Sequence, residues 1–248
     1  MKIGIIGGSG LDNPQFFENS QHIEVETEYG APSSSLVTGE IAGVQTVILA
    51  RHGRKHQFSP TEVNNRANIM ALKNAGVTHI IATTACGSLK EEIDRGHLVV
   101  LDQFIDFTRF RKNTFADSFE KGAVHTQMAS PFDSELRSRL YKAGIELGLT
   151  VHPSGCVVTI EGPRFSTIAE SKMFKMWGAD VINMSVAPEA MLANEAGIPY
   201  AAIAMSTDYD CWKEDEAPVT WEEILQVFNN NADNVTRLLR KVIETFNA

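Results

Sequence analysis

The sequence predicts an α/β fold, in which a largely parallel or mixed sheet is covered by helices on both faces. Three short, apolar, β-branched runs indicate buried strands at Val157–Ile160, Val181–Met184 and Ala201–Met205. Helical patterns at Ser166–Met176 and Pro188–Ala196 separate these strands. Strands that alternate with helices are typical of such sheets. A length of 248 residues suits one domain over 1–248 better than two small ones.

The rest of the chain continues this alternation of elements. We expect further strands at Lys2–Ile6, Val44–Leu49, His79–Ala82 and Leu98–Leu101, and a strand-like pattern from Ile23 to Ala50. We expect further helices at Glu62–Asn74, at Ser134–Leu147 and at Trp221–Phe246, the last one capped by Thr220. The segment Phe107–Ala123 is charged, aromatic and aperiodic, which predicts a long surface excursion.

Composition narrows the class of protein. A net charge of −9 argues against nucleic acid or an anionic membrane as the main partner, because both favour basic surfaces. The N-terminus lacks the pattern of a signal peptide, and no apolar run approaches the roughly 18 residues that span a bilayer. The three cysteines Cys86, Cys156 and Cys211 are odd in number and lack metal-site spacing. These features predict a reduced cytoplasmic protein with structural thiols.

A glycine-rich turn, Gly7-Gly8-Ser9-Gly10, follows the first predicted strand. The dinucleotide-binding fingerprint would need a third glycine at the position of Asn13, so that fingerprint is not met. Two interpretations remain open. The backbone N–H groups and the Ser9 hydroxyl could hold an anion, or the glycines could serve only a tight turn.

Cationic side chains follow the strand at Val44–Leu49. Arg51 and His52 stand at the strand end, where a guanidinium offers paired donors that match phosphate. The alternative is a solvated basic loop. His52 and His56 are four residues apart, as helical metal ligands are, but the intervening Gly53 and the lack of a neighbouring acid argue against a metal site.

A third strand end carries Thr84 and Cys86. Threonine hydroxyls bind phosphate oxygens readily. Cys86 could be a nucleophile, but no base lies near it in the sequence, so we interpret it as a buried structural thiol. Together the strand ends offer five anion-binding residues: Ser9, Arg51, His52, Thr84 and Ser185. Without a Walker loop or a carboxylate cluster for magnesium, they point to inorganic phosphate as a reactant.

Two carboxylates complete the constellation. Asp208 and Asp210 lie on one side of an extended segment, where they can recognise donors and, if protonated, deliver a proton. Phe165 and Met184 supply apolar surface for an aromatic ring and a sugar. Phosphate at one end and a purine-like heterocycle at the other indicate phosphorolysis of an N-glycosidic bond.

Six sequence blocks carry a resemblance to a known family. They are G-G-S-G-L-D, R-H-G-R-x-H, T-T-A-C-G-S-L, T-I-E-G-P-R-F-S-T-x-A-E-S, W-G-A-D-V-I-N-M-S and T-D-Y-D-C-W. Across nearly the whole chain, in order, the sequence resembles the 5′-methylthioadenosine phosphorylases of the purine nucleoside phosphorylase superfamily. The resemblance implies a barrel-like mixed sheet and a homotrimer. It also implies that inorganic phosphate is a co-substrate and that the enzyme uses no cofactor and no metal.

The resemblance also assigns roles to residues. It implies a phosphate site of Ser9, Arg51, His52, Thr84, Ala85 and Ser185. It places Phe165 and Met184 at the base and ribose, and Asp208 and Asp210 at the purine edge, with Asp208 as the proton donor. It places His125 near a neighbouring subunit's 5′ pocket. Ser166 and Trp221 fall at specificity positions, and Ile224, Leu225 and Trp221 share one helix face.

Two departures stand out. Serine replaces the threonine of eukaryotic members at positions 9 and 185, and Trp221 replaces a small valine near the 5′ pocket.

The implied reaction converts 5′-methylthioadenosine and phosphate to adenine and 5-methylthioribose 1-phosphate, a step of purine and methionine salvage. Three alternatives stay open. They are a phosphorylase for 6-oxopurine nucleosides or methylthioinosine, a nucleoside-binding module without turnover, and a hydrolase that uses Cys86. Dependence on phosphate separates the phosphorylases from the other two.

Overall fold

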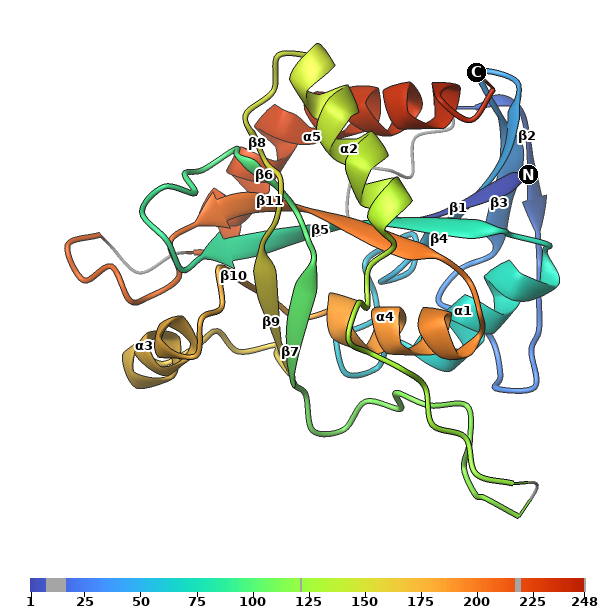
Figure 1. Cartoon of the computed structure of the whole chain (residues 1–248), viewed down its shortest axis with the longest axis horizontal. Coiled ribbons are helices and arrows are strands. Elements are labelled where there is room, and N and C mark those ends of the chain that lie inside the picture. The colour runs from blue at the N-terminus through green and yellow to red at the C-terminus, as the bar shows by residue number, and fades with distance from the viewer. Residues whose placement is uncertain (8–16, 121, 217–219, 248) are drawn as a thin grey trace.

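The computed structural model describes residues 1–7, 17–120, 122–216 and 220–247. In this part of the chain, eleven strands form one mixed sheet and five α-helices pack around it (Figure 1). The strands are β1 (Lys2–Gly7), β2 (Glu18–Ile23), β3 (Leu36–Ile41), β4 (Val44–Ala50), β5 (His79–Ser88), β6 (Leu98–Val100), β7 (Gln103–Phe107), β8 (Val151–His152), β9 (Cys156–Ile160), β10 (Val181–Asn183) and β11 (Tyr200–Asp208). The helices are α1 (Asn65–Asn74), α2 (Ser134–Glu146), α3 (Ile168–Met176), α4 (Val186–Glu195) and α5 (Trp221–Glu244). The predicted mixed sheet flanked by helices is confirmed.

Strand β5 is the junction of the sheet. One path of paired strands runs β2-β3-β4-β1-β5-β10-β9-β7, and β11, β6 and β8 branch from it at β5. The first half of β5 pairs in parallel with β1, while its end pairs antiparallel with β10. β11 runs parallel to β5 along almost its whole length. Strand β5 therefore joins the three parts of the sheet, through β1, β10 and β11.

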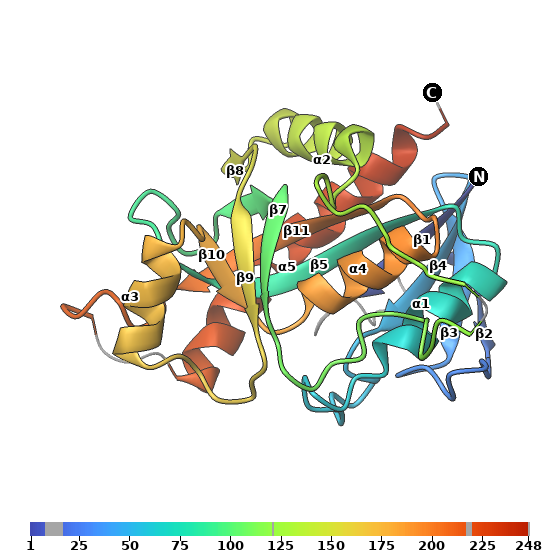
Figure 2. The ribbon, with the colours of Figure 1, turned by 60° about the horizontal axis from the view of Figure 1, so that its bottom comes forward.

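The helices form two layers on opposite faces of the sheet. α2 and α5 lie together on one face, and α1 and α4 on the other, as the rotated view makes clear (Figures 1 and 2). Side-chain alternation in β1 serves both layers. Ile3 and Ile5 belong to the apolar cluster under α2 and α5, and Ile6 belongs to the cluster that includes residues of α1 and α4. A third, smaller cluster packs Phe174 of α3 against the end of the sheet.

Helix α5 shows how the sequence determines an element. Thr220 and Glu223 form a capping box at its start, as the predicted cap required. Its buried residues recur at helical spacing: Ile224, Val235, Leu238, Leu239, Val242 and Ile243. This face packs on β11 and α2.

Several predicted boundaries were wrong. β5 continues to Ser88 rather than ending at Ala82, because pairing with β11 and β10 buries its polar second half. β11 likewise continues to Asp208. Helix α1 begins at Asn65 rather than Glu62, where the Asn64 side chain caps it. Strands β2, β7 and β8 were not predicted, and β7 ends at the residue where the excursion was expected to begin.

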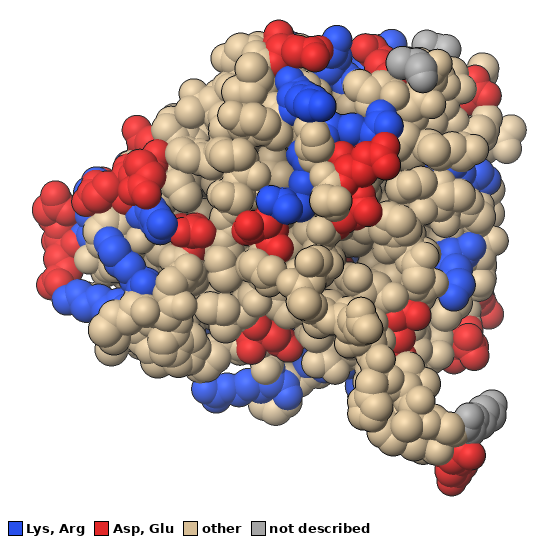
Figure 3. Space-filling view, in the orientation of Figure 1, with Lys and Arg blue, Asp and Glu red and all other residues tan. Residues whose placement is uncertain are grey.

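The surface is unevenly charged. Acidic side chains gather at the left end of the molecule in Figure 3, beside the loops that follow β5 and β11, while the surface over α3 is mostly uncharged. Among the described residues, no helix has the length and apolar character needed to cross a membrane.

Candidate active site

A cavity opens where the second halves of β5 and β11 meet the ends of β4 and β10 and the first turns of α5. Most of the predicted site residues line it: Arg51, His52, Thr84, Ala85, Phe165, Ser166, Met184, Ser185, Asp208, Asp210, Trp221, Ile224 and Leu225. Residues scattered over 175 positions of sequence therefore meet at one set of strand ends, as the α/β pattern predicted.

Arg51 is held in a buried ion pair with Glu189 of α4. Its Nε and Nη2 donate to the two Glu189 carboxylate oxygens at 2.5 and 3.0 Å, and its Nη1 donates to the Thr83 carbonyl at 2.8 Å. The Tyr200 hydroxyl donates to the same carboxylate at 2.8 Å. Arg51 is 2% exposed and Glu189 is completely buried. Burial acts to lower the pKa of Arg51, but the Glu189 carboxylate raises it above its ordinary value, so the guanidinium stays charged.

The sequence did not predict that Glu189 would accept hydrogen bonds from two of the Arg51 nitrogens. A guanidinium has five N–H groups. Three of those on Arg51 have partners within the described residues, at Glu189 and Thr83. The other two are available to a ligand in the cavity that Arg51 lines.

The His52 ring is held by a hydrogen bond to the backbone carbonyl of Phe58. The His52 ring Nδ1 lies 3.0 Å from the Phe58 carbonyl oxygen, so this nitrogen is the donor and carries the hydrogen of the neutral ring. Burial, and then the charge of Arg51, lowers the pKa of His52 to about 4. The ring also stacks on His56, with centroids 4.6 Å apart. His52 is therefore neutral near pH 7 in the unliganded site.

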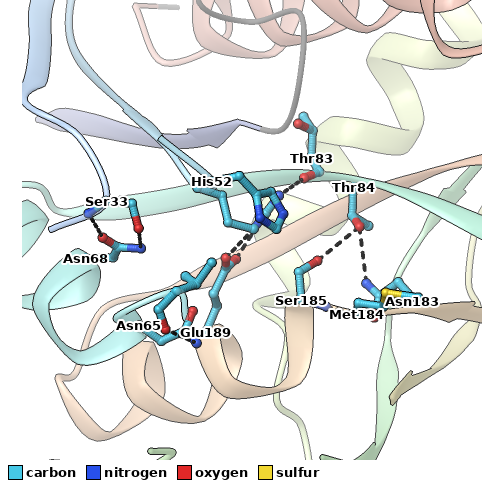
Figure 4. Close-up of polar contacts among 12 residues, drawn as sticks. Ser33, His52, Asn65, Asn68, Thr83, Thr84, Asn183, Met184, Ser185 and Glu189 are labelled. Atoms are coloured by element: carbon cyan, nitrogen blue, oxygen red, sulfur yellow. Dashed lines mark hydrogen bonds and ion pairs between the residues drawn. The ribbon is translucent and has the colours of Figure 1, made fainter. Parts of the chain in front are cut away.

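Two hydroxyls and an amide meet on the floor of the cavity. The Thr84 and Ser185 hydroxyl oxygens are 3.1 Å apart, and Asn183 Nδ2 donates to Thr84 Oγ1 at 3.3 Å (Figure 4). Ser185 is the N-cap residue of α4, but its side chain makes no capping hydrogen bond. Its hydroxyl is therefore available to the cavity, beside the positive end of the α4 dipole.

Asp208 and Asp210 form a second polar group in the same cavity. Thr207 Oγ1 donates to Asp208 Oδ2 at 2.8 Å, and the Asp210 backbone N–H donates to Asp208 Oδ1 at 2.7 Å. Burial raises the pKa of Asp208 to about 6, above its ordinary value of 3.8. Burial also raises the pKa of Asp210. Asp208 can therefore carry a proton near neutral pH.

Unsatisfied oxygen atoms beside this pair indicate where a ligand would bind. Asp210 Oδ2 and Ser166 Oγ are buried and make no hydrogen bond of standard geometry within the described residues, although the Ser166 and Ser171 hydroxyls lie close enough to the Asp210 carboxylate to oppose the rise of its pKa. Burying a polar atom without a well-aligned partner costs free energy, so these oxygens are suited to accept hydrogen bonds from a group bound in the cavity. Asp210 itself has a φ of 49°, a left-handed conformation that aspartate tolerates better than most residues. A ligand with N–H donors on its edge would satisfy these atoms.

The remaining wall of the cavity is apolar. Phe165, which is 42% exposed, and Met184 lie toward the polar groups, and Trp221, Ile224 and Leu225 come from the first turns of α5. The Trp221 ring approaches His56, with centroids 5.9 Å apart. The predicted apolar helix face therefore forms one end of the cavity.

Two predicted residues are not placed in this cavity. Ser9 lies outside the described residues, so the structure does not locate its hydroxyl. His125 is exposed and lies outside the cavity of its own chain, on the projecting segment between β7 and α2, where it contacts Phe119.

The cavity also contains residues that sequence reasoning missed. Asn183 and Thr207 line it without having been predicted; His56 and Cys86 line it too, and the predicted burial of the Cys86 thiol is confirmed. Burial raises the pKa of Cys86 well above its ordinary value, which disfavours the thiolate that a nucleophile needs. Asn183 was hidden because it falls inside a predicted strand, although a polar residue next to Met184 and Ser185 was a usable signal.

No metal site was found in the part of the chain that the structure describes. No group of three or more His, Cys, Asp or Glu side chains there is arranged to hold a metal ion.

Comparisons with known proteins agree with this geometry. A sequence model described as the phosphorylase superfamily matches residues 2–244. The chain is 53% identical over 247 residues to an S-methyl-5′-thioadenosine phosphorylase of Xenopus tropicalis, covering 98% of this chain and 88% of that protein. It is 52% identical over 246 residues to the protein of the same name from Danio rerio, with the same coverage.

Solved structures show the same similarity. The fold matches a methylthioadenosine phosphorylase from Schistosoma mansoni in complex with adenine, with a TM-score of 0.95 and 42% identity over 100% of this chain and 92% of that one. A point mutant of the adenosine/methylthioadenosine phosphorylase from the same organism, in complex with methylthioadenosine, matches with a TM-score of 0.94 and 41% identity at the same coverage.

Proposed function

Since the chain belongs to the S-methyl-5′-thioadenosine phosphorylases of the phosphorylase superfamily, we propose that it cleaves 5′-methylthioadenosine with inorganic phosphate. The products are adenine and 5-methylthioribose 1-phosphate. Phosphate is a co-substrate in this reaction, and no further cofactor takes part.

The spacing of the two polar groups along β5 is the observation that supports this reaction best. Ala204 of β11 pairs with Thr84, and Asp208 pairs with Gly87 of the same strand. Three residues of strand separate these positions by about 10 Å. Hydroxyl and guanidinium donors thus lie at one end and carboxyl groups at the other, with the apolar wall between and beside them. An anion and a heterocycle joined through a ribose would fit this separation.

In the proposed mechanism, Asp208 is the acid. It gives or shares a proton at N7 of the purine, so that adenine leaves as a neutral molecule. Its raised pKa of about 6 makes the protonated form accessible at neutral pH. The ribose carbon then carries oxocarbenium-like charge, which the bound phosphate stabilises before it attacks C1′.

The phosphate end uses donors from four places in the chain. Arg51 offers its two remaining N–H groups, Thr84 and Ser185 offer hydroxyls, and the N-terminus of α4 points toward the same space. Ser9 would add a fourth side-chain donor. His52, neutral and with Nδ1–H turned to Phe58, presents Nε2 as an acceptor in the unliganded protein, so it suits a hydroxyl of phosphate or ribose.

The base end favours a 6-aminopurine. Asp210 Oδ2 and Ser166 Oγ suit the donors of the 6-amino group, while Asp208 serves N7. A 6-oxo group would instead place an acceptor against an acceptor. A site that hydrogen-bonds one substrate can reject a mismatched analogue by roughly 10⁴–10⁵ in kcat/KM. Efficient cleavage of inosine or methylthioinosine would contradict this assignment.

The apolar wall of α5 suits the methylthio group. Its residues are Trp221, Ile224 and Leu225. Apolar pockets discriminate by only about 1–3 kcal/mol for a small group, so adenosine should be cleaved more slowly rather than rejected. Trp221→Val should change the ratio of kcat/KM for methylthioadenosine and adenosine by about 10-fold or more. An unchanged ratio would remove Trp221 from the 5′ pocket.

A homotrimer is the assembly that we propose for this enzyme. Apolar side chains are exposed on and beside α3, including Met176 at 80% and Trp177 at 49%, with Phe110 at 75% after β7. Exposed apolar side chains that gather in one place mark interaction sites. His125, which lies outside its own cavity, would reach the 5′ pocket of a neighbour. Sedimentation that finds a fully active monomer at assay concentration would exclude the trimer.

The deciding experiment is an assay of adenine release from methylthioadenosine, with and without phosphate. The proposal expects release only with phosphate, together with 5-methylthioribose 1-phosphate in equal amount. Release without phosphate would indicate a hydrolase, and binding of methylthioadenosine without any release would indicate a nucleoside-binding module.

A further inference from the structure

We propose that Asn183 and Thr159 are positioning residues that aim hydroxyl donors at the bound phosphate through a one-way chain of hydrogen bonds. The inference rests on the proposed function, because it assumes that phosphate occupies the cavity beside Thr84 and Ser185. Thr159 itself is completely buried and does not line the cavity. Its hydroxyl is linked to the hydroxyls of the cavity through Asn183.

The chain begins at a backbone donor whose direction is fixed. The Ala187 N–H lies in the first turn of α4, where helical N–H groups have no partner within the helix. It donates to Thr159 Oγ1 of β9 at 3.2 Å. An N–H group can only donate, so the Thr159 oxygen is the acceptor here. The Thr159 O–H is then left to donate elsewhere.

Asn183 passes the direction on. The Thr159 hydroxyl donates to Asn183 Oδ1 at 2.8 Å, and this contact fixes which end of the amide faces β9. The other end, Nδ2, consequently points to Thr84 Oγ1 at 3.3 Å (Figure 4). Asn183 is 5% exposed, so solvent does not offer an alternative set of partners.

Thr84 and Ser185 receive this orientation at the cavity. Because Thr84 Oγ1 accepts from Asn183, its own O–H must donate, and the Ala85 carbonyl at 2.9 Å and the Ser185 hydroxyl at 3.1 Å are within reach. If Thr84 donates to Ser185, the Ser185 O–H is released to donate in turn. In the arrangement with Thr84 donating to Ser185, the Ser185 hydrogen is directed to the cavity; when Thr84 donates to the Ala85 carbonyl, a phosphate oxygen competes with that carbonyl for the Thr84 hydrogen. An arriving phosphate oxygen is the stronger acceptor there, since it is ionised.

The physical gain is orientation before binding. A lone hydroxyl rotates and can present either its hydrogen or its lone pairs to an anion. Donors that are already aimed at the developing charge do not need to reorganise during the reaction. The network therefore favours the binding of phosphate without an additional charged side chain.

Thr159→Val is the test variant, because valine keeps the shape and removes only the hydroxyl. Without that hydroxyl, Asn183 Oδ1 keeps only the longer hydrogen bond from the Ser185 N–H at 3.5 Å, so the amide turns over more easily and presents its oxygen to Thr84. We expect the phosphate KM to rise about 2- to 10-fold, the value of one net hydrogen bond, with the methylthioadenosine KM within 2-fold of wild type. Thr159→Ser should restore the wild-type phosphate KM.

Asn183→Asp gives a stronger perturbation, since an ionised carboxylate only accepts hydrogen bonds. The Thr84 hydroxyl would turn toward it and away from phosphate, and the phosphate KM should rise roughly 10-fold or more. In a Thr84→Val background, Thr159→Val should add nothing, because the chain would already be cut. Thr46→Val is the matched control, as Thr46 is 1% exposed in β4 and, within the described part of the chain, its hydroxyl bonds to the Val44 carbonyl alone. It should leave both KM values unchanged.

Calorimetric titration of phosphate into each variant separates this inference from the proposed function. A wild-type protein that binds phosphate but releases no adenine would overturn the proposed function. The ratio of phosphate Kd between Thr159→Val and wild type would still decide the inference. An unchanged Kd in Thr159→Val, or a full effect of that substitution in the Thr84→Val background, would overturn it. Absence of phosphate binding in the wild type would overturn both.

Discussion

Replacing Asp208 by asparagine should make the protein more stable at alkaline pH while removing most of its activity. The carboxyl group is buried and its pKa is raised to about 6 from an ordinary 3.8. The folded state therefore holds the Asp208 proton more tightly than the unfolded state. This contribution to stability is fully present below pH 3.8 and is lost as the pH rises through 6. Asparagine is neutral at every pH and avoids the loss.

The size of the effect follows from the two pKa values. The gap between 3.8 and about 6 corresponds to about 3 kcal/mol of unfolding free energy, at about 1.4 kcal/mol for each pH unit. The asparagine can keep both hydrogen bonds of the carboxylate. Its oxygen accepts from the Asp210 N–H, and its amide donates to Thr207 Oγ1, whose own O–H turns to the Cys86 carbonyl at 3.1 Å. Its packing cost should be small and independent of pH.

Urea unfolding of wild type and Asp208→Asn at pH 4, 6 and 8 measures this directly. The difference in unfolding free energy should move by about 2 kcal/mol in favour of the variant between pH 4 and pH 8, because at pH 4 the Asp208 carboxyl of the unfolded chain is already more than half ionised. Titration of other groups, such as His52, is common to both proteins and cancels in the difference. Adenine release by the variant should fall about 10²- to 10⁴-fold, the usual value of a general acid.

In the wild type, kcat/KM for the nucleoside should fall as the pH rises above 6, because Asp208 loses its proton. Parallel stability curves for the two proteins, or an activity that stays flat to pH 8, would refute this account of Asp208.

Three further predictions concern the same cavity. Arg51→Lys should raise the phosphate KM roughly 10-fold or more in steady-state assays, because an ammonium cannot span both oxygens of Glu189 and a charge-assisted hydrogen bond contributes about 1.5–3 kcal/mol. An unchanged KM would remove Arg51 from the phosphate site. Gly87→Ala should lower turnover at least about 10-fold, because a Cβ there would lie 2.9 Å from Asp208 Oδ1 and would displace this reacting group. Full activity of the variant would show that Asp208 can move without loss of turnover. The His52 ring should stay neutral from pH 8 to pH 5 in NMR spectra, because burial lowers its pKa to about 4 from 6.5. Its contribution to stability should therefore be lost as the pH falls through 4, and a titration midpoint near 6.5 would contradict the burial of this ring.

Much of the site could be predicted because polar residues at strand ends stand out against apolar runs. Thr84 and Ser185 follow or end β-branched segments, and the α/β pattern brings such ends together. Arg51 was found by the same reasoning. The resemblance to a family then supplied residues that no local pattern marks, such as Trp221 on the first turn of a surface helix.

The missing partners could not be predicted for a physical reason. Glu189 lies 138 positions from Arg51, inside a helix whose sequence reads as alanine-rich and apolar. Only the packing of α4 against the sheet brings its carboxylate to the guanidinium. Asn183 and Thr159 pair across two neighbouring strands, and the register of that pairing is a property of the assembled sheet.

The position of β5 at the junction of the sheet limits how the sequence of this protein can evolve. The separation between Thr84 and Gly87 is a length of covalent backbone within one strand, so it does not depend on how the surrounding helices pack. Substitutions under α2 and α5, or under α1 and α4, can lower stability without altering that length. An insertion or deletion within β5 would instead shift one half of the site against the other and reverse the faces of the side chains beyond it. Sequence drift should therefore be tolerated in the helical layers, while the number of residues in this strand should stay constant.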